Sequence, residues 1–264
     1  MGRSTNLSGT TAVTVSFHAG RITICNVGDS RVVLGHRVTT DAYPIKEENL
    51  ELSTVGGTTQ KRTRREGYVA GIPLTKDQTP YRFSERERVK KAGAVVMTVD
   101  QMEGKETMHE QWAGLDDNVI DTSGDPPRVF QKGKEYPGCA FTRSLGDKIG
   151  ESCGIIPDPE MVTIDISKKD EYLVIASDGV FEFLSNQNVI DICSNASNPL
   201  EACRVIVQSS YKQWLQYENR TDDITAIVIF LHCEKGWKNS AKITAEMLLS
   251  KEDIHDFKPL HKRD

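Results

Sequence analysis

Apolar and polar residues alternate in three consecutive short segments near the start of the chain. Residues 11–18 place Val13, Val15 and Phe17 on one face, and the alternation resumes in residues 22–27. A Gly-Asp-Ser interruption separates these two segments from residues 31–35, which are again apolar. Three short strands joined by turns are predicted, in the form of an antiparallel meander.

Two longer apolar segments lie in the second half of the chain, and both adjoin acidic residues. Residues 172–179 read YLVIASDG, an apolar run that ends at Asp178. Residues 222–233 open with Asp222 and Asp223 and continue as an apolar run. Short apolar runs bounded by turn residues are typical of buried strands. We expect these aspartates at strand ends, where the rim of a sheet is open to ligands.

Helix signals occur at three places. Ser84 with Glu87 three residues later predicts a capping box, and Gly93 is placed to end that helix. Ser185 and Asn198 are predicted to cap a short and a longer helix.

The longer helix carries an apolar stripe at helical spacing. The residues of this stripe are Leu200, Cys203, Val207, Tyr211 and Trp214. Such a stripe predicts a face packed on the core rather than a cofactor site.

The order of these elements predicts the fold class. Strands come in runs and helices in a block, which is the pattern of an antiparallel α+β protein and not of alternating βαβ units. Residues 36–72, with the basic run at 61–66, are predicted to be irregular. Residues 100–137 are polar, with Gly, Asp and Pro clusters, and are predicted to form an ordered or mobile insertion. We expect one domain over 1–233 and a tail or linker over 234–264.

Composition narrows the function classes. The 264 residues carry a formal net charge of -5, so nothing indicates general nucleic-acid binding. No apolar run approaches the ~18 residues of a membrane span. No secretory signal is visible at the N-terminus, and the six cysteines are scattered without a C-x-x-C pair. These features predict reduced thiols and a cytoplasmic location.

One cysteine has the spacing of a phosphatase nucleophile. Cys25 and Arg31 are separated by five residues, as in the loop of cysteine phosphatases. That loop must wrap its N–H groups around phosphate and then enter a helix. Here Arg31 is followed by VVLG, a strand pattern, so we expect Cys25 to be an ordinary strand residue.

The aspartates suggest a different chemistry. Asp178, Asp222 and Asp223 lie beside buried strands, and no paired histidines accompany them. Taken alone, each of these motifs is also compatible with a simple turn. Carboxylate oxygens suit hard ions such as Mg²⁺ or Mn²⁺ better than zinc.

Eight short motifs occur in this sequence in the same order as in one protein family. They span about residues 8–232 and are similar to those of the metal-dependent serine/threonine phosphatases (protein phosphatase 2C). The motifs are SGTTAV, NVGDSR, LTKDQTP, ERERVKKAGA, FTRSLGD, IPDPE, ASDGVFEFLSNQ and DDIT. The resemblance implies an antiparallel β-sandwich flanked by helices, acting on phosphoprotein substrates.

The resemblance also implies a mechanism and a set of metal ligands. Two divalent ions, Mg²⁺ or Mn²⁺, lower the pKa of a shared water that attacks phosphoserine or phosphothreonine. Asp178 and Asp222 match the ligands of the two-metal site. Asp77, with Asp178 and Glu182, matches a third metal site, where the family usually has Asp in place of Glu182. No side chain is assigned as a catalytic group, because the nucleophile is water.

Further motif residues are implied to support these ligands or the fold. They are Asp29, Arg31, Arg143, Asp147 and Gly179.

One motif of the family is absent from this sequence, and several other segments resemble a particular subgroup of the family. The family carries an Asp-Gly-His-Gly motif whose Asp bridges both metals, and this sequence contains none. The chain is therefore expected to be the C-terminal portion of the domain and inactive alone; the alternative is a pseudophosphatase or regulatory binding module. Several segments resemble most the phosphatase part of proteins that also carry cyclic-nucleotide-binding and protein-kinase domains.

Overall fold

The structure is a computed structural model that describes residues 6–38, 68–110, 126–231 and 243–246. Its strands are β1 Gly9–Thr10, β2 Ala12–His18, β3 Arg21–Val27, β4 Arg31–Val38, β5 Tyr68–Pro73, β6 Ala94–Met97, β7 Arg128–Gln131, β8 Pro137–Cys139, β9 Leu145–Gly146, β10 Glu160–Asp165, β11 Asp170–Ala176, β12 Ala226–Leu231 and β13 Ile243–Glu246. Its helices are α1 Phe83–Lys91, α2 Val99–Met102, α3 Lys148–Glu151, α4 Asp178–Phe181, α5 Asn186–Asn195 and α6 Pro199–Tyr217. The α+β prediction is confirmed.

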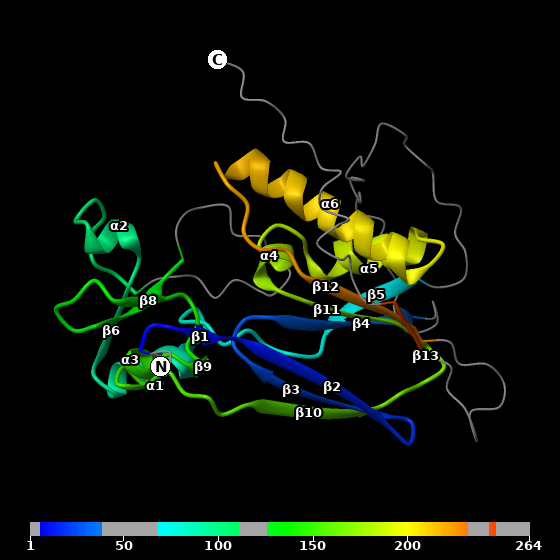
Figure 1. The fold of residues 1–264 in the computed structure, drawn as a ribbon, viewed down its shortest axis with the longest axis horizontal. Helices are drawn as coiled ribbons and strands as arrows, with labels where there is room; N and C mark the ends of the chain where they lie inside the picture. The colour runs from blue at the N-terminus through cyan, green and yellow to red at the C-terminus, as the bar shows by residue number, and fades with distance from the viewer. Residues whose placement is uncertain (1–5, 39–67, 111–125, 232–242, 247–264) are drawn as a thin grey trace, which may run out of the picture.

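Two antiparallel sheets form the centre of the molecule (Figure 1). One has the strand order β13-β12-β11-β4-β5 and the other β10-β3-β2. Ile22 and Ile24 of β3 pack on Leu34, Leu173 and Ile229 of the larger sheet. Burial of such side chains contributes about 25 cal/mol per Å² of apolar surface, so this layer is a main source of stability. The predicted sandwich is present.

Two helices lie on the other face of the five-stranded sheet (Figure 1). α5 packs on β5 and α6 on β12. Val174 and Val228 of the sheet join Val189 and Ile206 of the helices in one buried cluster. The larger sheet is thus covered on both faces, which explains why its strands read as continuous apolar runs.

A smaller unit is built beside the sandwich. The three-stranded sheet β6-β7-β8 packs with α1, and Val89, Val96, Val129 and Ile155 form its core. The insertion predicted over 100–137 contains β7 and the start of β8, which were not foreseen as strands. The irregular segment predicted over 36–72 is wrong at its two ends, where β4 continues to Val38 and β5 begins at Tyr68. Short strands of only a few residues give too little alternation to be recognised in a polar sequence.

The predicted meander is correct only for its first hairpin. β2 and β3 pair antiparallel from Ala12 opposite Val27 to His18 opposite Arg21, but β4 belongs to the other sheet. Gly28 has φ +103°, and an added Cβ would lie 2.4 Å from a Thr11 methyl carbon, so this crossing requires glycine.

The helix ends largely follow the sequence. Ser185 accepts a hydrogen bond from the N–H of Asn188, and Asn198 accepts one from the N–H of Glu201, so both predicted caps are confirmed. Gly93, with φ +97°, follows the last turn of α1 as predicted. The capping box at Ser84 is wrong, because α1 begins one residue earlier, at Phe83, and its N-cap Arg82 makes no side-chain cap.

The buried face of α6 is turned by about one position from the predicted stripe. Ala202, Cys203, Ile206 and Ser210 are buried, and only Cys203 belonged to the predicted set. Tyr211 is exposed. Ala202, Cys203 and Ile206 belong to the same buried cluster as Ala226 and Val228 of β12.

Some sequence predictions lie outside the described residues. The basic run at 61–66, Cys233 and nearly all of the tail over 234–264 are among them. The division of the chain at 233/234 stays a prediction. Within the described residues, no helix is long and apolar enough to cross a membrane.

Candidate functional site

Asp178 lies directly after the end of a buried strand. β11 ends at Ala176, and Asp178 is the first residue of α4. Its Oδ1 accepts a hydrogen bond of 2.8 Å from the N–H of Gly179. A Cβ at Gly179 would meet the carbonyl oxygen of Asp223 at 2.4 Å. Glycine is therefore required here so that the two loops can approach each other.

Asp222 and Asp223 were predicted at the start of a strand, and this is wrong. Both precede β12, which begins at Ala226. Ser177 holds their loop, because its Oγ donates to the carbonyl of Asp223 at 3.1 Å and its N–H donates to that of Thr225 at 3.0 Å. The loop is thereby fixed beside the start of α4, with Asp222 near Asp178.

Arg31 holds Asp77 in place. Its Nε and Nη2 donate to the two carboxylate oxygens of Asp77 at 3.0 and 2.6 Å. Nη1 donates to Asn186 at 3.0 Å, and the guanidinium lies 4.8 Å from the ring centroid of Phe181. A bidentate, partly buried pair of this kind fixes the carboxylate in one orientation. No pattern in the sequence indicated the role of Asn186.

The predicted acidic residues influence one another electrostatically. Burial, together with the carboxylates of Asp178 and Asp77, raises the pKa of Asp29 from 3.8 to about 7, and Glu182 adds a smaller repulsion. Burial and the neighbouring carboxylate of Asp222 likewise raise the pKa of Asp178. We call these five residues, Asp29, Asp77, Asp178, Glu182 and Asp222, the acidic cluster.

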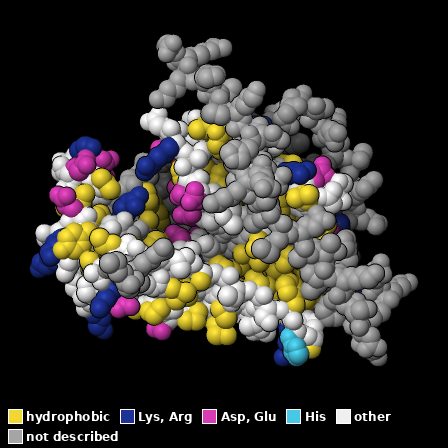
Figure 2. Space-filling model, viewed as in Figure 1, with side chains coloured by type: hydrophobic (Ala, Val, Ile, Leu, Met, Phe, Trp, Pro, Cys, Tyr) yellow, Lys and Arg dark blue, Asp and Glu magenta, His cyan; other side chains and the backbone are white. Residues whose placement is uncertain are grey.

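The acidic cluster fits divalent cations by its chemistry but is not a preformed cage. Carboxylate oxygens are the ligands of Mg²⁺ and Mn²⁺. Burial and the repulsion between carboxylates together raise these pKa values, and a nearby cation would oppose both effects by favouring the charged form. Among the described residues, however, no group of three or more His, Cys, Asp or Glu side chains is arranged to hold a metal ion. Figure 2 shows acidic side chains gathered near α4, beside a hollowed region with Lys and Arg on its other side.

Arg143 and Asp147 lie elsewhere and support the fold. Arg143 donates to both carboxylate oxygens of Glu85 at 2.8 and 3.1 Å and to the carbonyl of Asp158 at 2.8 Å. Asp147 accepts from Ser144 Oγ at 2.7 Å and has φ +48°. Neither residue belongs to the acidic cluster. The sequence missed Glu85, because a Glu inside a charged helix gives no sign that it is buried.

Cys25 is a strand residue, as expected. It lies in β3, opposite Thr14 of β2 and Met161 of β10. Arg31 begins β4 in the other sheet and binds Asp77 instead. No helix follows Arg31, so this segment forms no phosphate-binding loop.

Comparison with known proteins identifies the family. The family profile of Protein phosphatase 2C matches residues 2–214. "Probable protein phosphatase 2C 35" of Arabidopsis thaliana is 41% identical over 225 residues, which are 85% of this chain and 56% of the relative. "Probable protein phosphatase 2C 64" of Oryza sativa subsp. japonica is 31% identical over 227 residues, covering 85% of this chain and 42% of the relative. The chain spans about half the length of these relatives.

Solved structures agree on the fold. A serine-threonine phosphatase 2C from Toxoplasma gondii superposes with a TM-score of 0.56 at 16% identity, covering 84% of this chain and 58% of that one. A C. elegans sex determining protein gives a TM-score of 0.53 at 17% identity, covering 84% and 40%. The names of the two relatives mention neither kinase nor cyclic-nucleotide-binding domains, so they support only the broader resemblance. By its sequence and by its fold, this chain belongs to the protein phosphatase 2C family.

Proposed function

We propose that this chain acts as part of a metal-dependent protein serine/threonine phosphatase. The observation that carries the proposal is the acidic cluster, in which Asp178 follows β11 and shares an electrostatic environment with Asp77 and Asp222. Asp178, Asp222, Asp77 and Glu182 would hold Mg²⁺ or Mn²⁺. When bound, these ions supply a water of lowered pKa that can attack a phosphoryl group.

The chain's own residues prepare the site for that chemistry. Arg31 orients the carboxylate of Asp77 through two hydrogen bonds. The Asp29 carboxyl can hold a proton near neutral pH while the cluster contains no cation. Gly179 and Ser177 fix the loop of Asp222 against α4. These groups position ligands, and none of them is proposed to attack phosphate.

The alternative is a pseudophosphatase or a regulatory binding module. It is favoured by one feature of the sequence, the lack of an Asp-Gly-His-Gly motif within these 264 residues. Under the first proposal, residues outside this chain complete the site, and the chain alone is inactive.

A cytoplasmic location, and linkage to cyclic-nucleotide-binding and kinase domains, are further parts of the proposal. An immunoblot that sizes the natural protein, together with cell fractionation, tests them.

The test is Mn²⁺-dependent hydrolysis of a phosphothreonine peptide by the longest natural protein that contains this chain. We expect Asp178→Asn and Asp222→Asn each to lower kcat at least 100-fold. Asp223→Asn is the matched control, since Asp223 contributes its backbone carbonyl to the loop, and it should change kcat only a few-fold. Equal losses in all three variants would contradict the assigned ligands. No turnover by the wild-type protein would favour the pseudophosphatase.

A further inference from the structure

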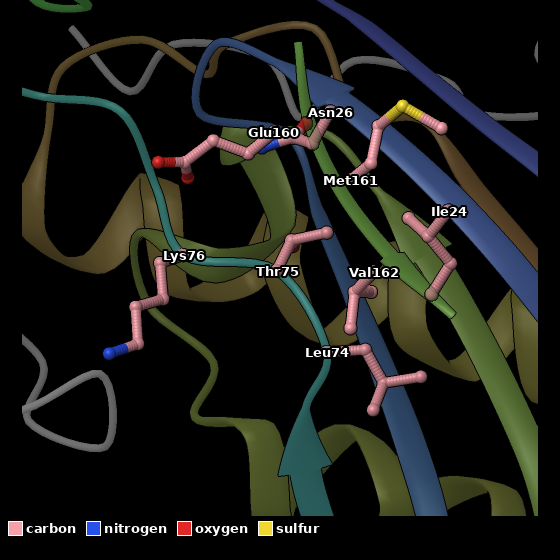
Figure 3. A pocket seen from close by; sticks show the side chains of 8 residues that line it. All are labelled: Ile24, Asn26, Leu74, Thr75, Lys76, Glu160, Met161 and Val162. Atoms are coloured by element: carbon pink, nitrogen blue, oxygen red, sulfur yellow. The ribbon is translucent and has the colours of Figure 1, made fainter. Parts of the chain in front are cut away.

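A pocket of about 320 Å³ opens between the two sheets at the β10 edge of the sandwich, and we call it the β10 pocket. One wall is the inner face of β3 and β10, where Val162 lies opposite Ile24 and Glu160 opposite Asn26. The other wall is the segment 74–76 that follows β5 (Figure 3). The volume is at the small end of the range of ligand pockets, about 300–1,000 Å³.

Hydrogen bonds fix the walls. The N–H of Leu74 donates to the carbonyl of Val32 at 2.8 Å, and Thr75 Oγ1 accepts from the N–H of Val32 at 3.0 Å. On the other wall, Arg82 donates to both carboxylate oxygens of Glu160 at 2.7 and 2.8 Å. The pocket is therefore formed before any ligand enters it.

Asn26 leaves an acceptor without a partner in this wall. The residue is 1% exposed, and its Nδ2 donates to the carbonyl of Gly28 at 3.2 Å. No hydrogen bond reaches its Oδ1 among the described residues. Exchanging the two amide atoms would not help, because it would set an oxygen against the Gly28 carbonyl and leave an NH₂ group unpaired. A buried acceptor without a partner costs about 1–3 kcal/mol.

The pocket adjoins the outer edge of β10, which has no strand partner on that side among the described residues. β10 is an outer strand of its sheet, with β3 as its strand partner among the described residues. Val162 is only partly buried, so its apolar surface is incompletely covered. An extended peptide can add to such an edge through its backbone and insert every second side chain into a pocket. Ile24, Leu74 and Val162 would receive an apolar side chain.

Charge at the mouth sets the preferred sequence of that peptide. Glu160 is neutralised by Arg82 and, at 3.4 Å, by Arg143. Lys76 is exposed, and no ion pair of its side chain occurs within the described part of the chain. Lys76 thus places one positive charge at the mouth that no carboxylate of the described residues neutralises in an ion pair, and this charge favours an acidic residue next to the apolar anchor. Lys76 also precedes Asp77 of the acidic cluster, so the pocket and that cluster are adjacent along the chain.

We propose that the β10 pocket docks an extended segment of the phosphoprotein substrate, in which an apolar side chain is followed by acidic residues. The proposal rests on the proposed phosphatase function for the identity of the partner. Binding of the segment itself needs neither metal nor phosphate, so it can be measured separately from catalysis.

The probe is a fluorescein-labelled, unphosphorylated peptide in which Leu and Val alternate with Thr and two Glu residues follow. Its binding to the purified protein is measured by fluorescence anisotropy in EDTA. We expect saturable binding at micromolar concentrations. Val162→Phe fills the pocket and should weaken binding at least 10-fold. Thr163→Phe is the matched control, because Thr163 is on the exposed face of the same strand, and it should leave binding within 2-fold.

A second pair of measurements does not depend on a core substitution. Lys76→Gln, at an exposed position, should weaken binding of the Glu peptide about 3-fold and leave a Gln-for-Glu peptide unchanged. No saturable binding to the wild-type protein, equal binding by Val162→Phe and the wild type, or equal effects of Lys76→Gln on both peptides would each overturn the proposal. Turnover of a short phosphothreonine peptide that lacks the segment tests the phosphatase function independently.

Discussion

Two buried carboxylate sites in this molecule have opposite electrostatics. Glu85 in α1 is buried, which by itself raises its pKa, yet hydrogen bonds from Arg143, Thr142 and Arg88 outweigh burial and hold the pKa at about 2. Asp29 at the acidic cluster is also buried, but its neighbours are other carboxylates, and its pKa rises to about 7. The first site is fully compensated within the chain, and the second is not.

The difference separates a structural role from a candidate functional one. The hydrogen bonds to Glu85 stabilise its charged form. Through Arg143, Glu85 also links α1 to the segment before β10. The carboxylates of the acidic cluster repel one another because no positive side chain of the described residues balances them all. This repulsion lowers the stability of the folded protein until a cation binds and relieves it. Perturbed carboxylates of this second kind are concentrated at functional sites.

The largest effect is expected from removing the compensated carboxylate. Glu85→Ala leaves Arg143 and Arg88 without their shared partner, and we expect the free energy of unfolding to fall by about 3 kcal/mol. Asp165→Ala is the control, because the Arg21–Asp165 pair is highly exposed and should contribute less than about 1 kcal/mol. Urea unfolding followed by circular dichroism measures both. Similar losses in the two variants would show that burial does not distinguish these pairs.

The pH dependence of stability should also report Glu85. Its pKa is about 2 in the folded protein and 4.5 for an unperturbed Glu side chain, so its stabilising contribution is complete above pH 4.5 and is lost as the pH falls toward 2. Glu85→Gln should therefore destabilise by about 2 kcal/mol at pH 6, and the difference from wild type should narrow below pH 4.5. Urea midpoints at several pH values test this. A constant difference from pH 6 to pH 3 would contradict the assignment.

Asp29 should respond in the opposite direction. Its folded pKa lies above its unfolded value, so its ionisation destabilises the fold progressively as the pH rises from about 4 to about 7. In EDTA at pH 8, Asp29→Asn should raise the free energy of unfolding by about 1–2 kcal/mol, and this gain should vanish near pH 4. Mn²⁺ should stabilise the wild type more than the variant. A destabilised Asp29→Asn protein in EDTA would remove the contrast with Glu85.

The smallest effect is expected at Cys25, which belongs to neither carboxylate site. Cys25→Ser exchanges one small side chain for another in β3, so phosphatase activity of the natural protein should stay within a few-fold of wild type. The assay is the same phosphothreonine hydrolysis, with unfolding curves as a check on the fold. If a folded Cys25→Ser variant lost several orders of magnitude of phosphatase activity, Cys25 would have to be considered again as the nucleophile.

The sequence by itself determined the features that depend on neighbouring residues. The caps at Ser185 and Asn198 and the turn at Gly93 were predicted because they depend on residues within one helical turn. The buried strands were visible because an apolar run needs no partner to be recognised. The order of short motifs identified the family, and the strand pattern after Arg31 already argued against a cysteine phosphatase.

Only the tertiary structure decided which residues distant in sequence meet. β4 left the predicted meander because a central strand is buried on both faces and pairs with β11, more than a hundred residues away. Glu85 is the centre of an ion-pair group because Arg143 reaches it, and the pKa of Asp29 is raised because burial and the carboxylate of Asp178 act on it together. Long-range packing determines both which residues are buried and which charged side chains lie next to them. Neither property can be read from the residues adjacent in sequence. The same reason hid the β10 pocket, whose walls come from three separate segments of the chain.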